Sequence, residues 1–139
     1  MNTCTRKILS IITLVIMLLS SVAQAETVQP RFTHIAQCSV GLSIHGGIAT
    51  VNGGGRGCYL DTYSTAAVCL MYRPLTGGAW DSFAMWRDYG VGQAYTSVDT
   101  TIAVDYGNEY KVYLAFYIQD ADGNILESFG AYSDVWSYP

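Results

Sequence analysis

The residues that could act as nucleophiles or metal ligands are few and widely spaced. The histidines are His34 and His45, and Cys38, Cys58 and Cys69 are separated by 20 and 11 residues. Structural zinc sites use pairs of ligands only a few residues apart, so this spacing predicts no metal site. A catalytic thiol needs cationic surroundings that lower its pKa, and this chain has 7 basic residues against 11 acidic ones. We therefore expect no metal, no cofactor and no Cys–His catalytic pair.

Two glutamates near the last predicted turn are candidates for acid and base catalysis. Glycosidases hold their two carboxylates about 5 to 10 Å apart. Pairing across Asp122-Gly123 would place Glu127 opposite Tyr117 or Ile118, which leaves it about 26 Å from Glu109 at about 3.3 Å per strand residue. The two side chains are not expected to share a substrate bond, and the sequence favours a protein without enzymatic activity.

Asp120, Asp122 and Asn124 present alternating oxygen ligands around Gly123, which is also a feature of calcium-binding loops. If Gly123 is the sixth-position glycine of such a loop, its first and twelfth positions fall on apolar residues that cannot bind the ion. Asp and Gly are also the residues that a tight turn requires. The segment therefore predicts a type I turn with Gly123 in the left-handed conformation.

Aromatic residues are the one group in excess, with 3 tryptophans and 11 tyrosines. A flat ring can stack on the apolar face of a sugar or against a protein at little entropic cost. Strands and cores use the same residues, so a purely structural role is the alternative. We expect a binding face, if present, to include Tyr113 and Tyr117, because the opposite row of their strand carries the apolar side chains.

Alternating polarity predicts the elements that position these side chains. Every second residue is apolar from Glu109 to Gln119 and from Thr65 to Arg73, which indicates two half-buried strands. Asn52–Gly57 is predicted as a bulge or loop, because glycine weakens a central strand. The other predicted strands are Thr33–Ile44, Ile48–Val51, Trp80–Arg87, Gln93–Val98, Thr101–Asp105 and Ile125–Trp136. Without helices to cover a sheet, such strands predict an all-β fold, an antiparallel two-sheet sandwich of the immunoglobulin-like type.

A leader is predicted before this domain. Arg6 and Lys7 precede the apolar run Ile8–Leu19, which at about 12 residues is too short to span a bilayer comfortably. Ala23-Gln24-Ala25 has the small-x-small pattern of signal peptidase sites, which predicts cleavage between Ala25 and Glu26. We expect residues 1–25 to be a helical signal peptide and residues 26–139 a single secreted domain, with membrane contact only through the uncleaved leader. Retention as a membrane anchor is the alternative.

Charge and cysteine count limit the partners of this domain. Residues 26–139 hold five basic and eleven acidic residues, a net charge of −6, whereas nucleic acids bind clustered lysines and arginines. We therefore exclude nucleic acid as a partner. Cys4 lies in the predicted leader, so residues 26–139 hold three cysteines and allow at most one disulfide within the domain. The sequence leaves all pairings among Cys38, Cys58 and Cys69 open. The third thiol would be free or would pair with another chain.

Two resemblances to known domains follow from particular segments. Val104–Val112 resembles the entry to the penultimate strand of immunoglobulin-like and fibronectin-type domains, where a tyrosine hydroxyl bonds back to the chain upstream, and Tyr110 would be that tyrosine. The mature region is also similar to a family of small secreted proteins of Gram-positive bacteria that contain a domain of unknown function. The matching segments are Ser39–Ile44, Gly46-Gly47 before Ile48–Thr50, and Trp80, Phe83 and Trp86 after Gly77-Gly78. The resemblance implies a secreted bacterial sandwich and transfers no active site.

These features favour a secreted, non-catalytic binding module that recognises carbohydrate or protein at the cell surface. The alternative is a small extracellular assembly protein, linked through a free cysteine or an open sheet edge. A hydrolase is the third hypothesis.

Overall fold

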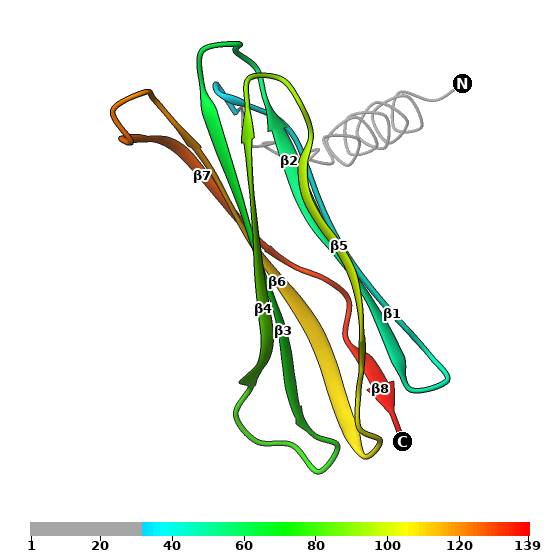
Figure 1. The fold of residues 1–139 in the computed structure, drawn as a ribbon. Helices are drawn as coiled ribbons and strands as arrows, with labels where there is room; N and C mark the ends of the chain where they lie inside the picture. The colour runs from blue at the N-terminus through cyan, green and yellow to red at the C-terminus, as the bar shows by residue number, and fades with distance from the viewer. Residues whose placement is uncertain (1–31) are drawn as a thin grey trace, which may run out of the picture. The chain divides into compact units, whose positions relative to one another are not determined.

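The computed structural model describes residues 32–139, which form a sandwich of two antiparallel β-sheets (Figure 1). Sheet A has the strand order β1-β2-β5, and sheet B has the order β4-β3-β6-β7, with β8 also paired to β6. The strands are β1 (Ile35–His45), β2 (Ile48–Gly57), β3 (Tyr63–Pro74), β4 (Asp81–Val91), β5 (Thr96–Ala103), β6 (Asn108–Gln119), β7 (Ile125–Tyr132) and β8 (Trp136–Tyr138). No helix in residues 32–139 is long and apolar enough to cross a membrane.

The predicted fold class is confirmed for these residues. The chain crosses between the sheets after β2, β4 and β5, and hairpins join the strands within each sheet, as in immunoglobulin-like sandwiches. The predicted signal peptide and its cleavage between Ala25 and Glu26 lie outside the described residues. The two strands expected in Gln93–Val98 and Thr101–Asp105 are one continuous strand, β5.

The first hairpin joins β1 to β2 through a two-residue turn, Gly46-Gly47. Gly46 and Gly47 adopt φ angles of 57° and 78°, the positive values that a two-residue type I′ turn requires. From this turn β2 runs as the middle strand of sheet A and pairs with β1 on one side and β5 on the other (Figure 1).

The prediction that Asn52–Gly57 forms a bulge or loop is wrong, because this stretch is the second half of β2. Its glycines are needed for close packing. A Cβ atom on Gly53 would lie 2.9 Å from a methyl group of Val68 in sheet B, and one on Gly55 would lie 2.5 Å from the Gln37 carbonyl oxygen. Both distances are shorter than those of real Cβ contacts, so a side chain at either position would clash with its neighbours. Glycine therefore allows β2 to pack closely against them.

The core lies between the sheets and is centred on β6. Its inward row is completely buried and consists of Tyr110, Val112, Leu114, Phe116 and Ile118, so the predicted alternation is confirmed. Ala66, Val68 and Leu70 of the neighbouring strand β3 are also fully buried. They pack in one cluster with Leu42, Ala49 and Val51 of sheet A. Burial of these apolar side chains is the main force that joins the two sheets.

Tyr110 makes the predicted corner at the entry to β6. Its hydroxyl donates a hydrogen bond to the Asp105 carbonyl oxygen at 2.7 Å and accepts one from the Asp105 amide at 3.0 Å. Its ring packs edge-on against Phe83 of β4 with 5.8 Å between the ring centroids. Burial is the main cause that raises the pKa of the Tyr110 hydroxyl above its ordinary value. The corner thus ties the β5–β6 connection to the core.

Glu127 of β7 binds the chain where it enters β1. Its carboxylate accepts hydrogen bonds from the backbone amides of Thr33, His34 and Ile35 at 3.0, 2.7 and 2.7 Å. Burial alone would raise the pKa of Glu127, but the three amide donors together hold it below its ordinary value. This contact, which we call the Glu127 clasp, joins the first strand of sheet A to the edge strand of sheet B.

The last predicted strand, Ile125–Trp136, is interrupted. The ladder between β6 and β7 ends at Tyr132, where the Ser133 hydroxyl accepts the hydrogen bond of the Val112 amide at 2.8 Å. The chain then resumes pairing with β6 as β8, and the Gly107 amide donates to the Tyr138 carbonyl oxygen at 2.6 Å. A serine side chain that replaces a backbone partner gives no periodicity signal, so the break is not apparent from alternation.

Candidate functional site

Tyr113 and Tyr117 lie on the outward row of β6, as predicted, but both rings are half-buried. The ring of Tyr113 lies 4.9 Å from that of Tyr132, at an angle of 41° between the ring planes. It also covers Gly130, where a Cβ atom would lie 2.7 Å from the Tyr113 hydroxyl. Tyr117 is flanked in the sheet by Thr65 and Ser128. The two predicted tyrosines therefore form the floor of a surface and not its most exposed part.

More exposed apolar side chains surround this floor. Tyr89 and Tyr132 are 68% and 57% exposed, and Met85 and Val91 are each 58% exposed. The register of β3 with β4 places Met85 and Tyr89 on the same outward side as Tyr113. We call this outer surface of sheet B the aromatic face. The β4 members were not predicted from the sequence, although the alternation of Met85, Arg87, Tyr89 and Val91 indicates one outward row.

Cations and rings form a continuous row at one end of the aromatic face. The Lys111 ammonium lies 4.3 Å from the ring centroids of both Trp80 and Tyr132. The Arg73 guanidinium lies 4.6 Å from the Trp80 ring, and its Nε atom donates to Glu109 at 2.7 Å. Each cation–π contact contributes about 0.5–1 kcal/mol at an exposed site. The row fixes the orientation of long side chains that would otherwise be flexible.

The aromatic face is basic, although the chain as a whole is acidic. Among residues 32–139 the basic residues are Arg56, Arg73, Arg87 and Lys111, and the last three lie on the outward rows of sheet B. Glu109 is the one acidic residue on the outward strand positions of that sheet, and Arg73 neutralises it. The face is therefore a positively charged, aromatic area on a negatively charged domain.

The outer surface of sheet A has the opposite character. Its outward positions are mostly serine, threonine, glycine and asparagine, with one acidic residue, Asp99. A hollow of about 280 Å³ lies over the middle of β2 and is lined by Ser39, Asn52, Gly54, Tyr95, Ser97 and Asp99, among others. We call this area the polar face.

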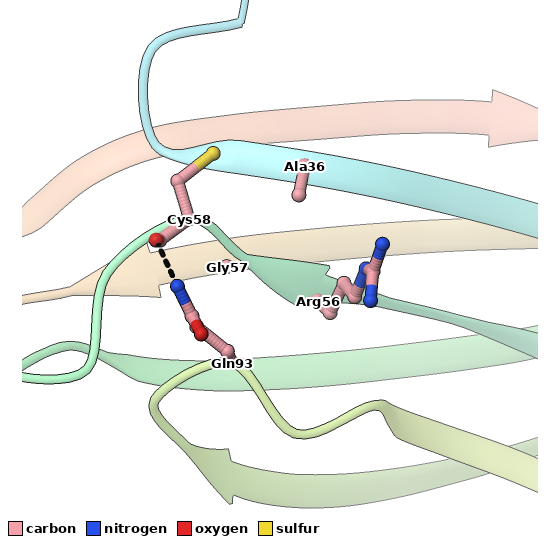
Figure 2. Close-up of a pocket in the computed structure, with 5 residues that line it drawn as sticks. All are labelled: Ala36, Arg56, Gly57, Cys58 and Gln93. Carbon is pink, nitrogen blue, oxygen red and sulfur yellow. Dashed lines mark hydrogen bonds between the residues drawn. The ribbon is translucent and has the colours of Figure 1, made fainter.

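A second hollow, of about 370 Å³, lies at the end of β2 and is lined by Ala36, Arg56, Gly57, Cys58 and Gln93 (Figure 2). The Gln93 amide donates a hydrogen bond to the Cys58 carbonyl oxygen at 2.6 Å, which links the β2–β3 and β4–β5 connections. Figure 2 shows the Cys58 thiol turned away from this bond, toward the start of β1. The lining provides one thiol and one cation but no histidine or carboxylate, so it contains no nucleophile–base pair.

No disulfide joins Cys38, Cys58 and Cys69, all of which are partly buried. Cys38 packs against the core, and its pKa is raised to about 11, first by burial and then by the negative charge of Glu127. Cys69 lies on the outward row of β3, with its sulfur 3.3 Å from the Ser82 hydroxyl. Because Cys38 and Cys69 lie on opposite sides of sheet B, they cannot be bridged in this fold.

Glu109 and Glu127 lie far apart, as the sequence predicted. Glu127 pairs with Ile118 and Glu109 with Ser137, so the two glutamates lie nine positions apart along β6, about 30 Å at about 3.3 Å per residue. They do not act on one bond. No group of three potential metal ligands occurs within residues 32–139.

The predicted turn between β6 and β7 is confirmed. Gly123 has a φ angle of 84°, and its amide donates to the Asp120 carbonyl oxygen at 3.1 Å. The Asp120 carboxylate accepts hydrogen bonds from the side chain and backbone of Asn124 and from the Asp122 amide. These donors, with the Asn124 side chain foremost, hold the pKa of Asp120 below its ordinary value. Its carboxylate oxygens are thus used by the turn itself.

Compared with known proteins, the chain matches no family model and no curated protein sequence. Its functional interpretation therefore depends on the two outer surfaces of the sandwich.

Proposed function

We propose that this protein is a secreted, non-enzymatic binding domain that binds an acidic protein surface through its aromatic face. The observation that supports this most strongly is the concentration of exposed rings and of three basic residues on one side of an acidic domain. A large exposed apolar area on a soluble domain marks an interaction site. Aromatic residues and arginine are enriched in protein interfaces, where they form the energetic centre.

The ring arrangement and the apolar side chains of this face favour a protein partner over a sugar. Tyr113 and Tyr132 are tilted by 41° to each other, so their rings do not form one continuous stacking platform. Met85 and Val91 add flexible and apolar contacts that suit another protein surface. The positive charge of Arg87 and Lys111 would attract an acidic partner and speed its association.

Site-specific photo-crosslinking tests this proposal. A photoreactive phenylalanine analogue replaces Tyr89 or Tyr132 in the full-length chain, and Tyr106 serves as the matched control because it is 78% exposed in the β5–β6 connection. We expect the same protein to be crosslinked from Tyr89 and Tyr132 but not from Tyr106. The affinity of the domain for the crosslinked protein should decrease with added salt and in the Arg87→Glu variant, because both reduce the charge attraction. Equal crosslinking from Tyr106, or affinity that is indifferent to salt and to Arg87, would reject the proposal.

The location of Cys69 supports assembly through a disulfide as a second function. Its thiol lies on the aromatic face between Met85 and Tyr113, so contact between two copies through this face would bring the two Cys69 residues together. A non-reducing gel of the oxidised protein should then show a dimer that Cys69→Ser abolishes and Cys58→Ser retains. A monomer under these conditions would exclude this function and leave the first proposal unaffected.

A further inference from the structure

The hollow on the polar face is built around a tyrosine that lies across the sheet. Tyr95 immediately precedes β5, and its hydroxyl is 2.6 Å from that of Ser39 on β1. Between β5 and β1 runs β2, which pairs with both. Because adjacent strands are about 4.8 Å apart, the tyrosine side chain spans about 10 Å of the sheet together with the serine. It can do so only by lying along the surface and crossing β2.

A glycine leaves the sheet surface near Tyr95 without a side chain. In the register of sheet A, Gly54 of β2 lies between Ser39 of β1 and Ser97 of β5, and it presents no side chain outward. Tyr95 and Gly54 both line the hollow, and 45% of the tyrosine remains exposed to solvent. The hydrogen bond to Ser39 holds the ring in place. The hollow thus has a fixed aromatic surface along one side.

Two side chains with free hydrogen-bonding capacity lie beside this ring. Asn52 and Asp99 are directly paired neighbours on β2 and β5, and both line the hollow. Gly41, the partner of Asn52 on β1, leaves the space that the Asn52 amide occupies, since a Cβ atom there would lie 2.8 Å from its oxygen. Asn52 offers donors and an acceptor, whereas Asp99 offers only acceptors. The hydroxyl of Ser97 adds a third polar group.

We propose that this hollow binds an uncharged carbohydrate, with one sugar ring stacked on Tyr95 and its hydroxyl groups hydrogen-bonded by Asn52 and Asp99. A sugar ring has an apolar face for stacking, and its hydroxyls both donate and accept hydrogen bonds, which matches an amide next to a carboxylate. Hydrogen bonds to the charged Asp99 are the stronger of these. The volume of about 280 Å³ is close to the lower end of the range for ligand pockets.

The charge and ligand set of the hollow exclude other classes of ligand. Asp99 is the one charged residue in the lining and would repel phosphate or carboxylate groups. A single carboxylate with neutral side chains is too few strong ligands for a tightly bound calcium ion. A neutral sugar can hydrogen-bond to the solvent-exposed Asp99 carboxylate and brings no negative charge for it to repel.

Binding of the full-length chain to an array of neutral and acidic oligosaccharides tests the site. We expect binding to neutral glycans, with affinity lowered at least about tenfold by Tyr95→Ala and by Asp99→Ala, because each removes a principal contact. Tyr106→Ala and Asp61→Ala are the matched controls, since both residues are exposed and lie outside the hollow. They should leave affinity unchanged. Tyr95→Phe keeps the ring but loses the bond to Ser39, and should bind between the wild-type and Tyr95→Ala levels.

The inference is overturned if no neutral glycan binds, if only acidic glycans bind, or if binding is unaffected by both Tyr95→Ala and Asp99→Ala. Thermal unfolding of each variant shows whether the fold is retained, and Asp99→Ala decides the outcome if Tyr95→Ala is unstable. Replacement of Tyr132 should not change glycan binding, because it lies on the other sheet. The carbohydrate site and the proposed protein partner can therefore fail independently.

Discussion

The two sheets of this protein bury similar side chains but expose very different ones. On sheet B the outer surface is aromatic and basic, with Tyr89, Tyr132 and Arg87 exposed on it. On sheet A it is formed mainly by small polar residues, with Tyr95 as the ring next to the hollow. The inner rows only have to fill the core, so they carry little information about function. The outer rows differ in chemistry, and this difference is the basis of the two binding proposals.

The strongest test of the difference between inner and outer rows is a pair of neighbours on β6. Phe116 is fully buried and Tyr117 is half-buried on the aromatic face. Phe116→Ala should lower the free energy of unfolding by about 3–5 kcal/mol, because it leaves a cavity in the core. Tyr117→Ala should lower it by only about 1 kcal/mol. Urea denaturation of the two variants measures this, and equal losses would mean that Tyr117 supports the fold as strongly as a core residue does.

The second test compares two glycines of sheet A. A Cβ atom on Gly55 would approach the Gln37 carbonyl oxygen at 2.5 Å and the Cys38 sulfur at 2.8 Å, and the backbone oxygen cannot move away easily. Gly55→Ala should therefore cost about 1–3 kcal/mol of stability. Gly41→Ala is the matched control, because its nearest neighbour is the end of the flexible Asn52 side chain, and it should change stability by less than about 0.5 kcal/mol. If both substitutions were neutral, close packing would not explain the glycine run.

The third test concerns the Glu127 clasp, which joins the two sheets. Glu127→Gln should lower the free energy of unfolding at pH 7 by about 1–2 kcal/mol, because it weakens three hydrogen bonds to a charged acceptor. The pKa of Glu127 is lowered in the folded protein, so its contribution is present above the unfolded value of about 4.3 and disappears as the pH falls through the folded value. Stability measured from pH 7 to pH 3 should therefore show the variant and the wild type converging.

Asp122→Asn is the control for these stability measurements. The Asp122 carboxylate lies in the adjacent turn and accepts no hydrogen bond within the described residues. A constant difference between wild type and Glu127→Gln down to pH 3 would contradict the role of the clasp.

Local patterns were sufficient to predict the elements whose form depends on their own residues. The alternation of Glu109–Gln119 and the turn at Asp120–Asn124 are confirmed, and so is the Tyr110 corner that the resemblance to immunoglobulin-like domains implied. In each of these, the side chains that determine the structure lie within a few residues of one another. The same reasoning placed Tyr113 and Tyr117 on the outward side of their strand.

Features that depend on distant strands could not be predicted. The glycines of Asn52–Gly57 have low strand propensity, and only the close approach of Val68 and Cys38 shows why they belong in β2. The polar hollow depends on a contact between Tyr95 and Ser39, which are 56 residues apart in the chain. Such a contact follows from the order β1-β2-β5, and no spacing in the sequence indicates it.

The last strand, β8, contacts both sheets of the sandwich. Its backbone pairs with the first residues of β6, while the Trp136 ring packs 5.8 Å from His45 of sheet A. Tyr138 reaches the first hairpin, where its hydroxyl would lie 3.1 Å from a Cβ atom on Gly47. Loss of β8 would therefore remove contacts with the start of β6, next to the Tyr110 corner, and with the β1–β2 hairpin together.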